Sequence, residues 1–214
     1  MTASPTHDTA ASTKSHKADP LHQDPNPSIN DEAAEDRLHA LRHYLLRNIR
    51  YHTRRAALFA QWHKLTAFVG VFFGSTAAMS FLFSDTPTAA SIMAAIVALF
   101  SAIDLVVGTA AKEAQHMELR RRWIALQKRF EVEGLTSDIQ QTLRSIEMDE
   151  PAELSVVEMQ AHNDATLALL GDDGRKELLQ IPLKKRIIGQ FMNIDTSSIT
   201  KAPTPDGAPA ATSS

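Results

Sequence analysis

Residues 65–83 read LTAFVGVFFGSTAAMSFLF, and this uncharged stretch decides the fold. A helix of this length spans about 28 Å at a rise of 1.5 Å per residue, which is close to the hydrocarbon thickness of a bilayer. After the short polar break of residues 84–87, SDTP, residues 88–108 form a second apolar stretch that only Asp104 interrupts. So short a connection predicts an antiparallel hairpin. In lipid both halves must be helical, because no water is present to satisfy free backbone groups.

The alternative interpretation of these residues is a buried helical hairpin inside a soluble bundle. Bundle helices normally carry a polar face, and neither apolar stretch has one. We therefore predict an all-α membrane protein. Its parts are a two-helix transmembrane hairpin, long cytoplasmic helical extensions that pair as an antiparallel coiled coil, and a small cytoplasmic helical bundle.

The chain on either side of the hairpin is polar. Its composition and hydrophobic spacing predict where the flanking helices and the disordered ends begin and end. Residues 1–29 and 195–214 are rich in Ser, Thr, Ala and Pro, cannot bury a core, and predict a disordered leader and a disordered tail. An amphipathic helix over 30–64 is expected to run without a break into the first span. The second span is expected to continue, also without a break, as a cytoplasmic helix over 109–134.

Residues 135–194 predict further cytoplasmic helices. One begins with a Ser or Thr cap after Gly134, and the next runs from Pro151, which suits a first helical position, to Gly171. The last segment combines apolar residues with three basic ones, Lys184, Lys185 and Arg186. It suits either a final bundle helix or a helix lying on the anionic inner leaflet, in contact with lipid.

Apolar residues recur at helical spacing on both cytoplasmic extensions. Folding the hairpin about its loop brings Leu119 near His52 and Trp123 near Ile49. Two stripes identified separately therefore face each other, which indicates an antiparallel coiled coil.

Basic residues gather at both outer ends of the hairpin, and the connecting loop has none. By the positive-inside rule both termini are cytoplasmic and the loop lies outside. No apolar segment of a cleavable signal peptide occurs in the first 30 residues, so the first span itself is expected to direct the protein to the membrane.

Composition excludes several classes of function. The chain has no cysteine, which excludes thiolate chemistry, and its net charge of −3 argues against a nucleic-acid partner. His39 and His43 lie one helical turn apart, a spacing that can bind zinc, but no further ligand stands nearby in sequence. No Gly-rich phosphate loop, nucleophile elbow or metal-ligand cluster occurs, so we predict no enzyme, no cofactor and no metal.

Asp104 is the one formal charge inside the apolar stretches. Carboxylates within a membrane often line pores or carry protons. The hairpin register instead places Asp104 opposite Ala67 and within a turn of His63 and Lys64, where it can pair or reach water. Both interpretations stay open.

Each span carries a face of small residues, which lets membrane helices approach closely. The face of the first span is Gly70, Gly74 and Ala78, and the face of the second is Ser91, Ala95, Ala98 and Ala102. These faces either pack the hairpin on itself or form contacts between subunits.

The layout resembles the SLATT family of two-transmembrane bacterial effectors. The resemblance is carried by RNIRYHTRRAALFAQWHK (47–64), IDLVVGTAAKEAQHMELRRRWIAL (103–126), IEMDEP (146–151) and AHND (161–164). It maps Asp104, Arg122 and Trp123 onto the pattern of the family. It implies a protein of the bacterial inner membrane that oligomerises and perforates that membrane in conflict systems, with a nucleotide-signalling or sensor protein as partner.

Our leading hypothesis is therefore a membrane effector that oligomerises and forms a pore or perturbs the inner membrane. The alternative is a membrane-anchored scaffold whose cytoplasmic helices recruit a partner. A small transporter fits less well, because two spans supply few polar contacts for a substrate.

Overall fold

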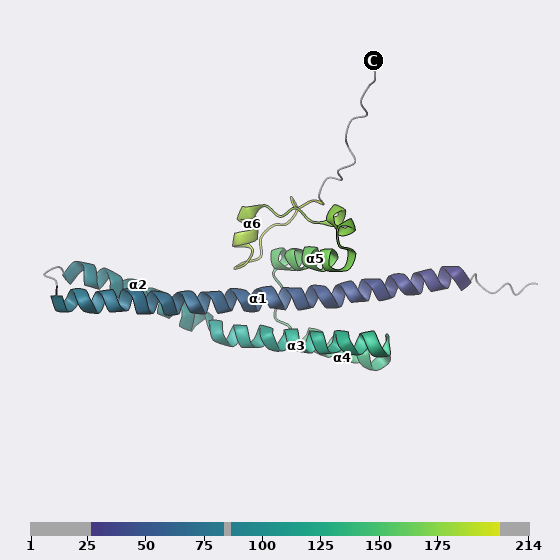
Figure 1. Cartoon of the computed structure of the whole chain (residues 1–214), viewed down its shortest axis with the longest axis horizontal. Helices are drawn as coiled ribbons and strands as arrows, with labels where there is room; N and C mark the ends of the chain where they lie inside the picture. The colour runs from purple at the N-terminus through teal and green to yellow at the C-terminus, as the bar shows by residue number, and fades with distance from the viewer. Residues whose placement is uncertain (1–26, 84–86, 202–214) are drawn as a thin grey trace, which may run out of the picture. The chain divides into compact units, whose positions relative to one another are not determined.

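The computed structural model describes residues 27–83 and 87–201, and in these ranges the chain is helical with no strand (Figure 1). The helices are α1 (Pro27–Phe83), α2 (Pro87–Val107), α3 (Thr109–Glu133), α4 (Ser137–Met148), α5 (Ser155–Leu170), the 3-10 helix η1 (Asp173–Glu177) and α6 (Leu183–Ile188). The prediction of an all-α fold is confirmed for this part of the chain. The leader up to residue 26, loop residues 84–86 and the tail from residue 202 lie outside the described residues.

The chain divides into two compact units, residues 1–37 and residues 38–214. The described part of the first unit is the start of α1, and its side chains from 31 to 37 are exposed. All contacts reported below lie within the second unit.

α1 is continuous over 57 residues. It passes from the amphipathic region into the apolar region without a break, as the sequence predicts. It begins at Pro27, three residues before the predicted start. Proline suits the first turn of a helix, because its missing N–H would have no partner there.

The second predicted helix is broken at its centre. α2 ends at Val107 and α3 begins at Thr109, because Gly108 between them adopts a left-handed conformation with φ of 65°. The prediction of an uninterrupted helix here is wrong. A side chain would be strained in this conformation, and glycine adopts it freely. Gly108 N donates to Asp104 O (2.9 Å) at the end of α2, and Lys112 N donates to Gly108 O (3.0 Å) at the start of α3, so both helices end at this residue.

The main core forms where α1, α3 and α4 meet. Trp123 and Leu45 are fully buried in it, and each side chain of this size contributes about 1.5–3 kcal/mol by leaving water. The buried members are Leu45, Ile49, Leu119, Trp123, Leu126, Phe130, Ile139 and Ile146. Both predicted stripes therefore enter one core, but α4 completes it, so the core draws on three helices. The coiled-coil geometry stays a prediction.

The predicted neighbours Ile49, Leu119 and Trp123 lie in the same buried cluster. His52 on α1 also contacts His116 on α3, and Trp123 packs edge-on against Tyr44, with ring centroids 5.9 Å apart. The facing stripes of α1 and α3 therefore meet, as the sequence predicts.

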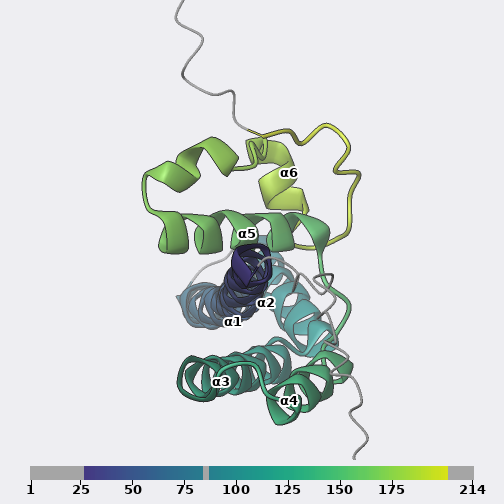
Figure 2. The same cartoon turned by 90° about the vertical axis from the view of Figure 1, so that its right-hand side faces the viewer.

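α5 lies on the opposite side of α1 from α3 and α4 (Figures 1 and 2). α4 starts with the predicted cap, since Thr136 Oγ1 accepts from Ile139 N at 3.3 Å. α5 ends as predicted at Gly171, with φ of 59°. It starts at Ser155, however, so the predicted start at Pro151 is wrong. The N–H of Leu154 donates to the hydroxyl of Tyr51 on α1 (3.1 Å), which fixes this segment outside the helix.

The C-terminal segment folds back along α5. Leu179 and Lys201 form an antiparallel bridge, and Gln180 N donates to Thr200 O at 2.9 Å. The predicted disordered tail therefore begins too early at residue 195, because residues up to 201 are paired with the preceding segment.

Candidate functional site

The apolar parts of α1 and α2 are little buried by the rest of the chain. Two stretches, within Asp31–Ser80 and within Thr88–Glu133, are long and apolar enough to cross a membrane, and 17% and 6% of their most apolar windows are buried. Leu105 and Val106 are 83% and 85% exposed. A core helix of a soluble bundle would bury such side chains, so the alternative of a buried hairpin finds no support within this chain.

Asp104 lies at the break between α2 and α3, and both of its carboxylate oxygens have partners. The hydroxyl of Thr109 donates to Oδ1, and His63 Nδ1 lies 3.7 Å from Oδ2. The partner on α1 is thus His63, not Lys64, which the sequence offered as one pairing. This arrangement holds α2, α3 and α1 together beside Gly108, which favours the pairing interpretation of Asp104.

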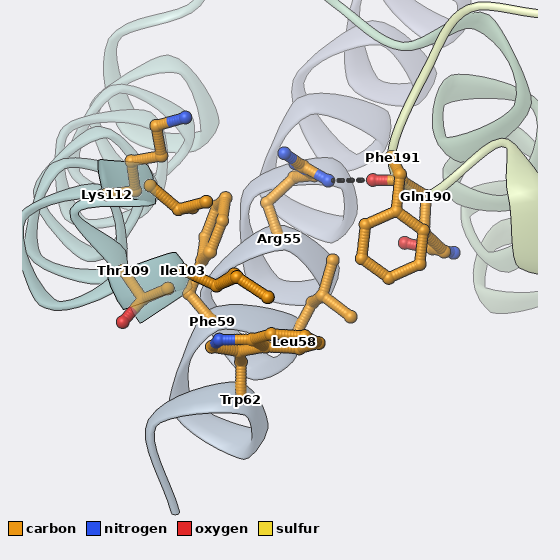
Figure 3. A pocket seen from close by; sticks show the side chains of 10 residues that line it. Arg55, Leu58, Phe59, Trp62, Ile103, Thr109, Lys112, Gln190 and Phe191 are labelled. Carbon is orange, nitrogen blue, oxygen red and sulfur yellow. Dashed lines mark hydrogen bonds between the residues drawn. The ribbon is translucent and has the colours of Figure 1, made fainter. Parts of the chain in front are cut away.

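A cavity of about 240 Å³ opens next to this junction (Figure 3). Arg55, Phe59 and Trp62 line it from α1, Lys112 lines it from α3, and Phe191 closes it from the segment after α6. The guanidinium of Arg55 lies 4.8 Å from the centre of the Phe59 ring and donates to the backbone oxygen of Gln190 at 2.7 Å. The cavity thus joins the apolar helices to the C-terminal segment.

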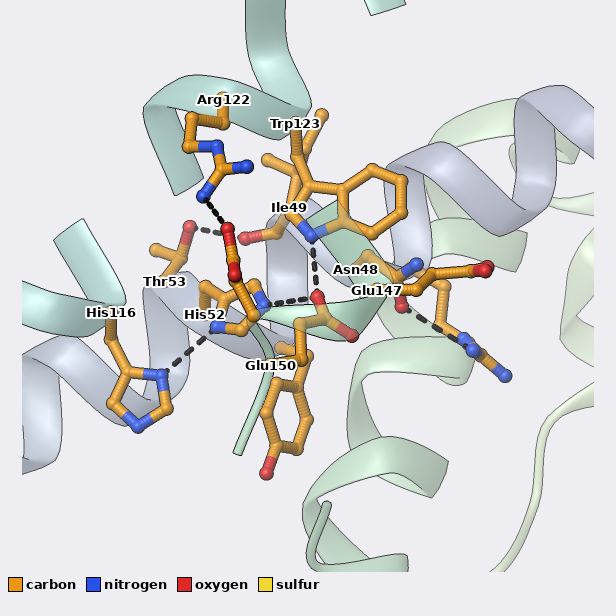
Figure 4. A network of polar contacts seen from close by, with 12 residues as sticks. Asn48, Ile49, His52, Thr53, His116, Arg122, Trp123, Glu147 and Glu150 are labelled. Carbon is orange, nitrogen blue, oxygen red and sulfur yellow. Dashed lines mark hydrogen bonds and ion pairs between the residues drawn. The ribbon is translucent and has the colours of Figure 1, made fainter. Parts of the chain in front are cut away.

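Glu150 is the centre of a polar network that joins the linker between α4 and α5 to the two long helices (Figure 4). Its Oε1 accepts from Trp123 Nε1 at 2.5 Å and from His52 Nε2 at 2.8 Å. His52 Nδ1 lies 2.9 Å from His116 Nδ1. His52 therefore links Glu150 to His116 through its two ring nitrogens.

His116 stays neutral at pH 7. Burial, with the nearby His52, Arg55 and Lys112, lowers the pKa of His116 to about 3. A positive charge on His116 would be unpaired, and burying an unpaired charge is costly.

Arg122 and Trp123 are neighbours on α3, and they bind neighbouring acids of the linker. Arg122 Nη1 lies 2.7 Å from Asp149 Oδ2, while Trp123 donates to Glu150. Tyr44 on α1 donates to Glu147 just before them. The cluster that the sequence singled out therefore attaches the linker to the core.

α5 is attached to α1 by arginines. Arg54 makes a two-pronged contact with Asp164, with Nε and Nη2 at 2.7 and 2.8 Å from the carboxylate oxygens, and Arg47 lies 2.7 Å from Glu158. Two-pronged pairs hold both position and orientation. Asp164 belongs to the AHND stretch, so the structure gives that stretch a packing role.

The predicted histidine pair does not form a metal site among the described residues. His43 Nε2 lies 3.1 Å from Thr166 Oγ1, and its ring packs edge-on against His162 with centroids 4.7 Å apart. Burial lowers the pKa of both His43 and His162, which suits neutral, structural side chains.

The small-residue faces of the spans are open. A Cβ built on Gly70 or Gly74 would meet no atom within 4 Å. On α2 the small residues are all exposed, namely Ser91, Ala95, Ala98 and Ala102, and so is Ala78 on α1. Within 65–80 and 88–108, Val69 and Ala90 are the only buried residues. Gly70 and Gly74 therefore have no close neighbour from the second helix of the hairpin.

The three basic residues of α6 differ in their surroundings. Lys184 and Arg186 are exposed. Lys185 Nζ donates to Asp195 O at 2.5 Å and to Ser198 Oγ at 2.8 Å. Two of the three are thus available for lipid contact, and Lys185 holds the C-terminal segment.

Sequence reasoning missed His116 and Glu150. His116 lies three residues before Leu119, on the same stripe, so a polar residue on a buried face was the available signal. Glu150 lies in the IEMDEP stretch, but its role was not predictable, because its partner His52 is 98 residues away.

These residues define a class: a helical protein in which two helices long and apolar enough to cross a membrane are joined to a bundle held by polar contacts. The chain matches no protein-family model, and neither the curated proteins nor the solved structures give a match.

Proposed function

We propose that this protein is a two-span membrane effector that oligomerises in the bilayer and forms a pore or perturbs the membrane. The observation that carries the proposal is the open small-residue face around Gly70 and Gly74. In lipid, helices associate through close packing of such faces. Because the hairpin leaves the space beside Gly70 and Gly74 open, a second copy of the chain can pack there.

The structure also supplies a route from the cytoplasmic bundle to the spans. α1 is one continuous helix, so a displacement of its cytoplasmic half is transmitted to the first span. The second span is separated from α3 by Gly108, which lets it tilt independently. A signal that moves the bundle would therefore change how the small faces of the two spans meet.

The resemblance of residues 47–64 and 103–126 to the SLATT family favours the same proposal. It adds a bacterial inner-membrane location, with both termini cytoplasmic, and a nucleotide-signalling or sensor protein as the source of the signal. In this proposal Asp104 holds the junction below the membrane, and the small faces line the contacts between subunits.

The test is membrane depolarisation after induced expression, together with the oligomeric state of the purified chain in detergent. Gly74→Leu fills the small face and is expected to abolish both oligomer and depolarisation. Ser75→Leu adds the same bulk one residue away, off that face, and should keep both. A wild-type chain that is monomeric and leaves the membrane potential unchanged would overturn the proposal.

A scaffold is the second candidate, and exposed apolar side chains outside the spans favour it. Val132 and Met148 are the most exposed of these, at 87% and 80%, and a partner could cover them. Replacing residues 65–108 with an unrelated two-span hairpin separates the candidates. A scaffold keeps its activity after this exchange, and an effector whose spans form the pore loses it.

A further inference from the structure

The cavity beside Arg55 combines a cationic and an apolar lining. Its charged side chains are Arg55 and Lys112, and no carboxylate lines it. Its apolar side includes Ile103 and Val107 from the end of α2 and Trp62 from α1. One side of the cavity is thus cationic and the other is apolar.

The two cations flank a single ring. Arg55 lies 4.8 Å and Lys112 5.8 Å from the centre of the Phe59 ring (Figure 3). Neither takes part in an ion pair within the described part of the chain. Asp104, which adjoins the lining residue Ile103 in sequence, contacts Thr109 and His63. The positive charge of the cavity is therefore not neutralised by the protein.

Two donors beside the cavity are shielded from solvent, Arg55 Nε and Trp62 Nε1, and the described residues provide no partner for either. Neither atom is open to the cavity, so a ligand in the cavity would meet the charges of Arg55 and Lys112.

The position of the cavity in the chain indicates which ligand this is. Trp62 lies three residues before the predicted first span, and Val107 is at the end of the second. In a protein that spans a membrane, this is the level of the lipid headgroups, where tryptophan is enriched and basic pockets between helices bind anionic headgroups.

We propose that this cavity binds an anionic phospholipid, with the phosphate between Arg55 and Lys112 and the acyl chains along Ile103, Val107 and Trp62. The proposal rests on the membrane-spanning arrangement of the proposed function. A bound lipid would hold α1, the start of α3 and the segment at Phe191 together, so lipid composition would control the coupling of the bundle to the spans.

The experiment uses the full chain purified in detergent, with phospholipid per chain measured by mass spectrometry and the thermal midpoint measured with added lipid. The probes are phosphatidylglycerol, phosphatidylcholine with the same acyl chains, and inorganic phosphate. We expect only phosphatidylglycerol to be retained and to raise the midpoint. One juxtamembrane cation contributes about fivefold in binding, so Lys112→Gln should lower retention about fivefold and R55Q/K112Q about 25-fold.

The matched control is R50Q/K128Q, which removes two exposed cations from the same two helices and should retain lipid as the wild type does. Lys112→Gln serves as the variant that keeps the fold, because Lys112 is exposed. Equal retention in R55Q/K112Q and the wild type would overturn the proposal. So would phosphatidylcholine binding as well as phosphatidylglycerol, or inorganic phosphate alone giving the full shift, which would assign the site to a water-soluble anion.

The two proposals fail in different ways. Extraction of membranes with alkaline carbonate reports whether the chain is inserted, and Gly74→Leu removes the oligomer without touching the cavity. If Gly74→Leu retains lipid but R55Q/K112Q does not, the lipid site stands whatever the oligomeric state. If the chain is washed from membranes by carbonate, the spanning arrangement and the proposed function fail, and the lipid assignment fails with them.

Discussion

The two halves of α1 are parts of one helix in very different surroundings. Between residues 45 and 59 its buried side chains are Leu45, Asn48, Ile49, Tyr51, His52, Ala56 and Phe59. Between residues 65 and 80 it buries Val69 alone. The first half is enclosed by α3, α4 and α5, while the second half leaves its small and apolar side chains uncovered.

This difference shows which half of α1 is covered by the chain's own side chains and which half is left uncovered. The enclosed half has a core and a network of polar contacts supplied by its own sequence, so it needs no partner to be stable. The open half exposes Phe68, Val71 and the face around Gly70, and apolar surface of this kind is normally covered by lipid or by another protein surface. Variants of the enclosed region should therefore lower the free energy of unfolding, whereas variants of the open region should change association and leave folding intact.

The largest effect is expected from Trp123→Ala, which breaks the enclosed region. It leaves a cavity in the core and removes a donor from Glu150, at a cost of about 3–5 kcal/mol in the free energy of unfolding. Chemical denaturation of the full chain in detergent, followed by far-UV circular dichroism, measures this loss. Val132→Ala on the same helix, at an 87% exposed position, should change the value by less than about 0.5 kcal/mol. Equal effects from both would contradict the assignment of the core.

A smaller effect is expected from acid, again confined to the enclosed region. The pKa of His116 is lowered from 6.5 to about 3, so the unfolded chain binds this proton at higher pH than the folded chain does. The stability that this group contributes is complete above pH 6.5 and is lost as the pH falls toward 3. Between pH 7 and pH 5 the loss is about 2 kcal/mol.

The matched variant for this pH effect is His116→Gln, which keeps a hydrogen-bonding side chain but does not titrate. Its unfolding free energy should fall less steeply between pH 7 and pH 5 than that of the wild type. The slope that remains comes from other groups, including His43 and His162, whose pKa values are also lowered. Identical slopes would show that His116 does not stay neutral in the folded chain.

The smallest effect is expected from Gly108→Ala, which tests the boundary between the two regions. A left-handed alanine costs about 1–2 kcal/mol, so the thermal midpoint in a detergent that keeps the chain monomeric should fall. Gly70→Ala is the control, because Gly70 has no positive φ and a Cβ there meets no atom within 4 Å. If both variants unfold at the same temperature, the break after α2 is not a fixed feature.

The apolar helices could be predicted from sequence because hydropathy is a local property. The stripe residues Leu119 and Trp123 could be placed in the core for a similar reason, since helical periodicity identifies a buried face. The break at Gly108 could not, because a single glycine is tolerated inside a helix and only its φ shows the interruption. Local patterns thus defined elements and faces, but not their exact ends.

Contacts between residues far apart in the chain could not be predicted from the sequence. Proline at the first position of a helix is common, so Pro151 favoured a helix start. In the structure the N–H of Leu154 donates to the hydroxyl of Tyr51 instead, and the helix starts at Ser155. The roles of Glu150 and Asp164 depend on partners about 100 residues earlier, His52 and Arg54. Their pairing depends on how the helices pack, which no local pattern contains.

The distance between His52 and Glu150 in the sequence also fixes an order of events during synthesis. At about 5–20 residues per second, a ribosome adds the 98 residues that separate them in about 5–20 s. The apolar helices between them are made within this interval, before Glu150 exists. The apolar helices are therefore synthesised while His52 still lacks its partner Glu150, so this contact of the bundle can form only after both apolar helices exist.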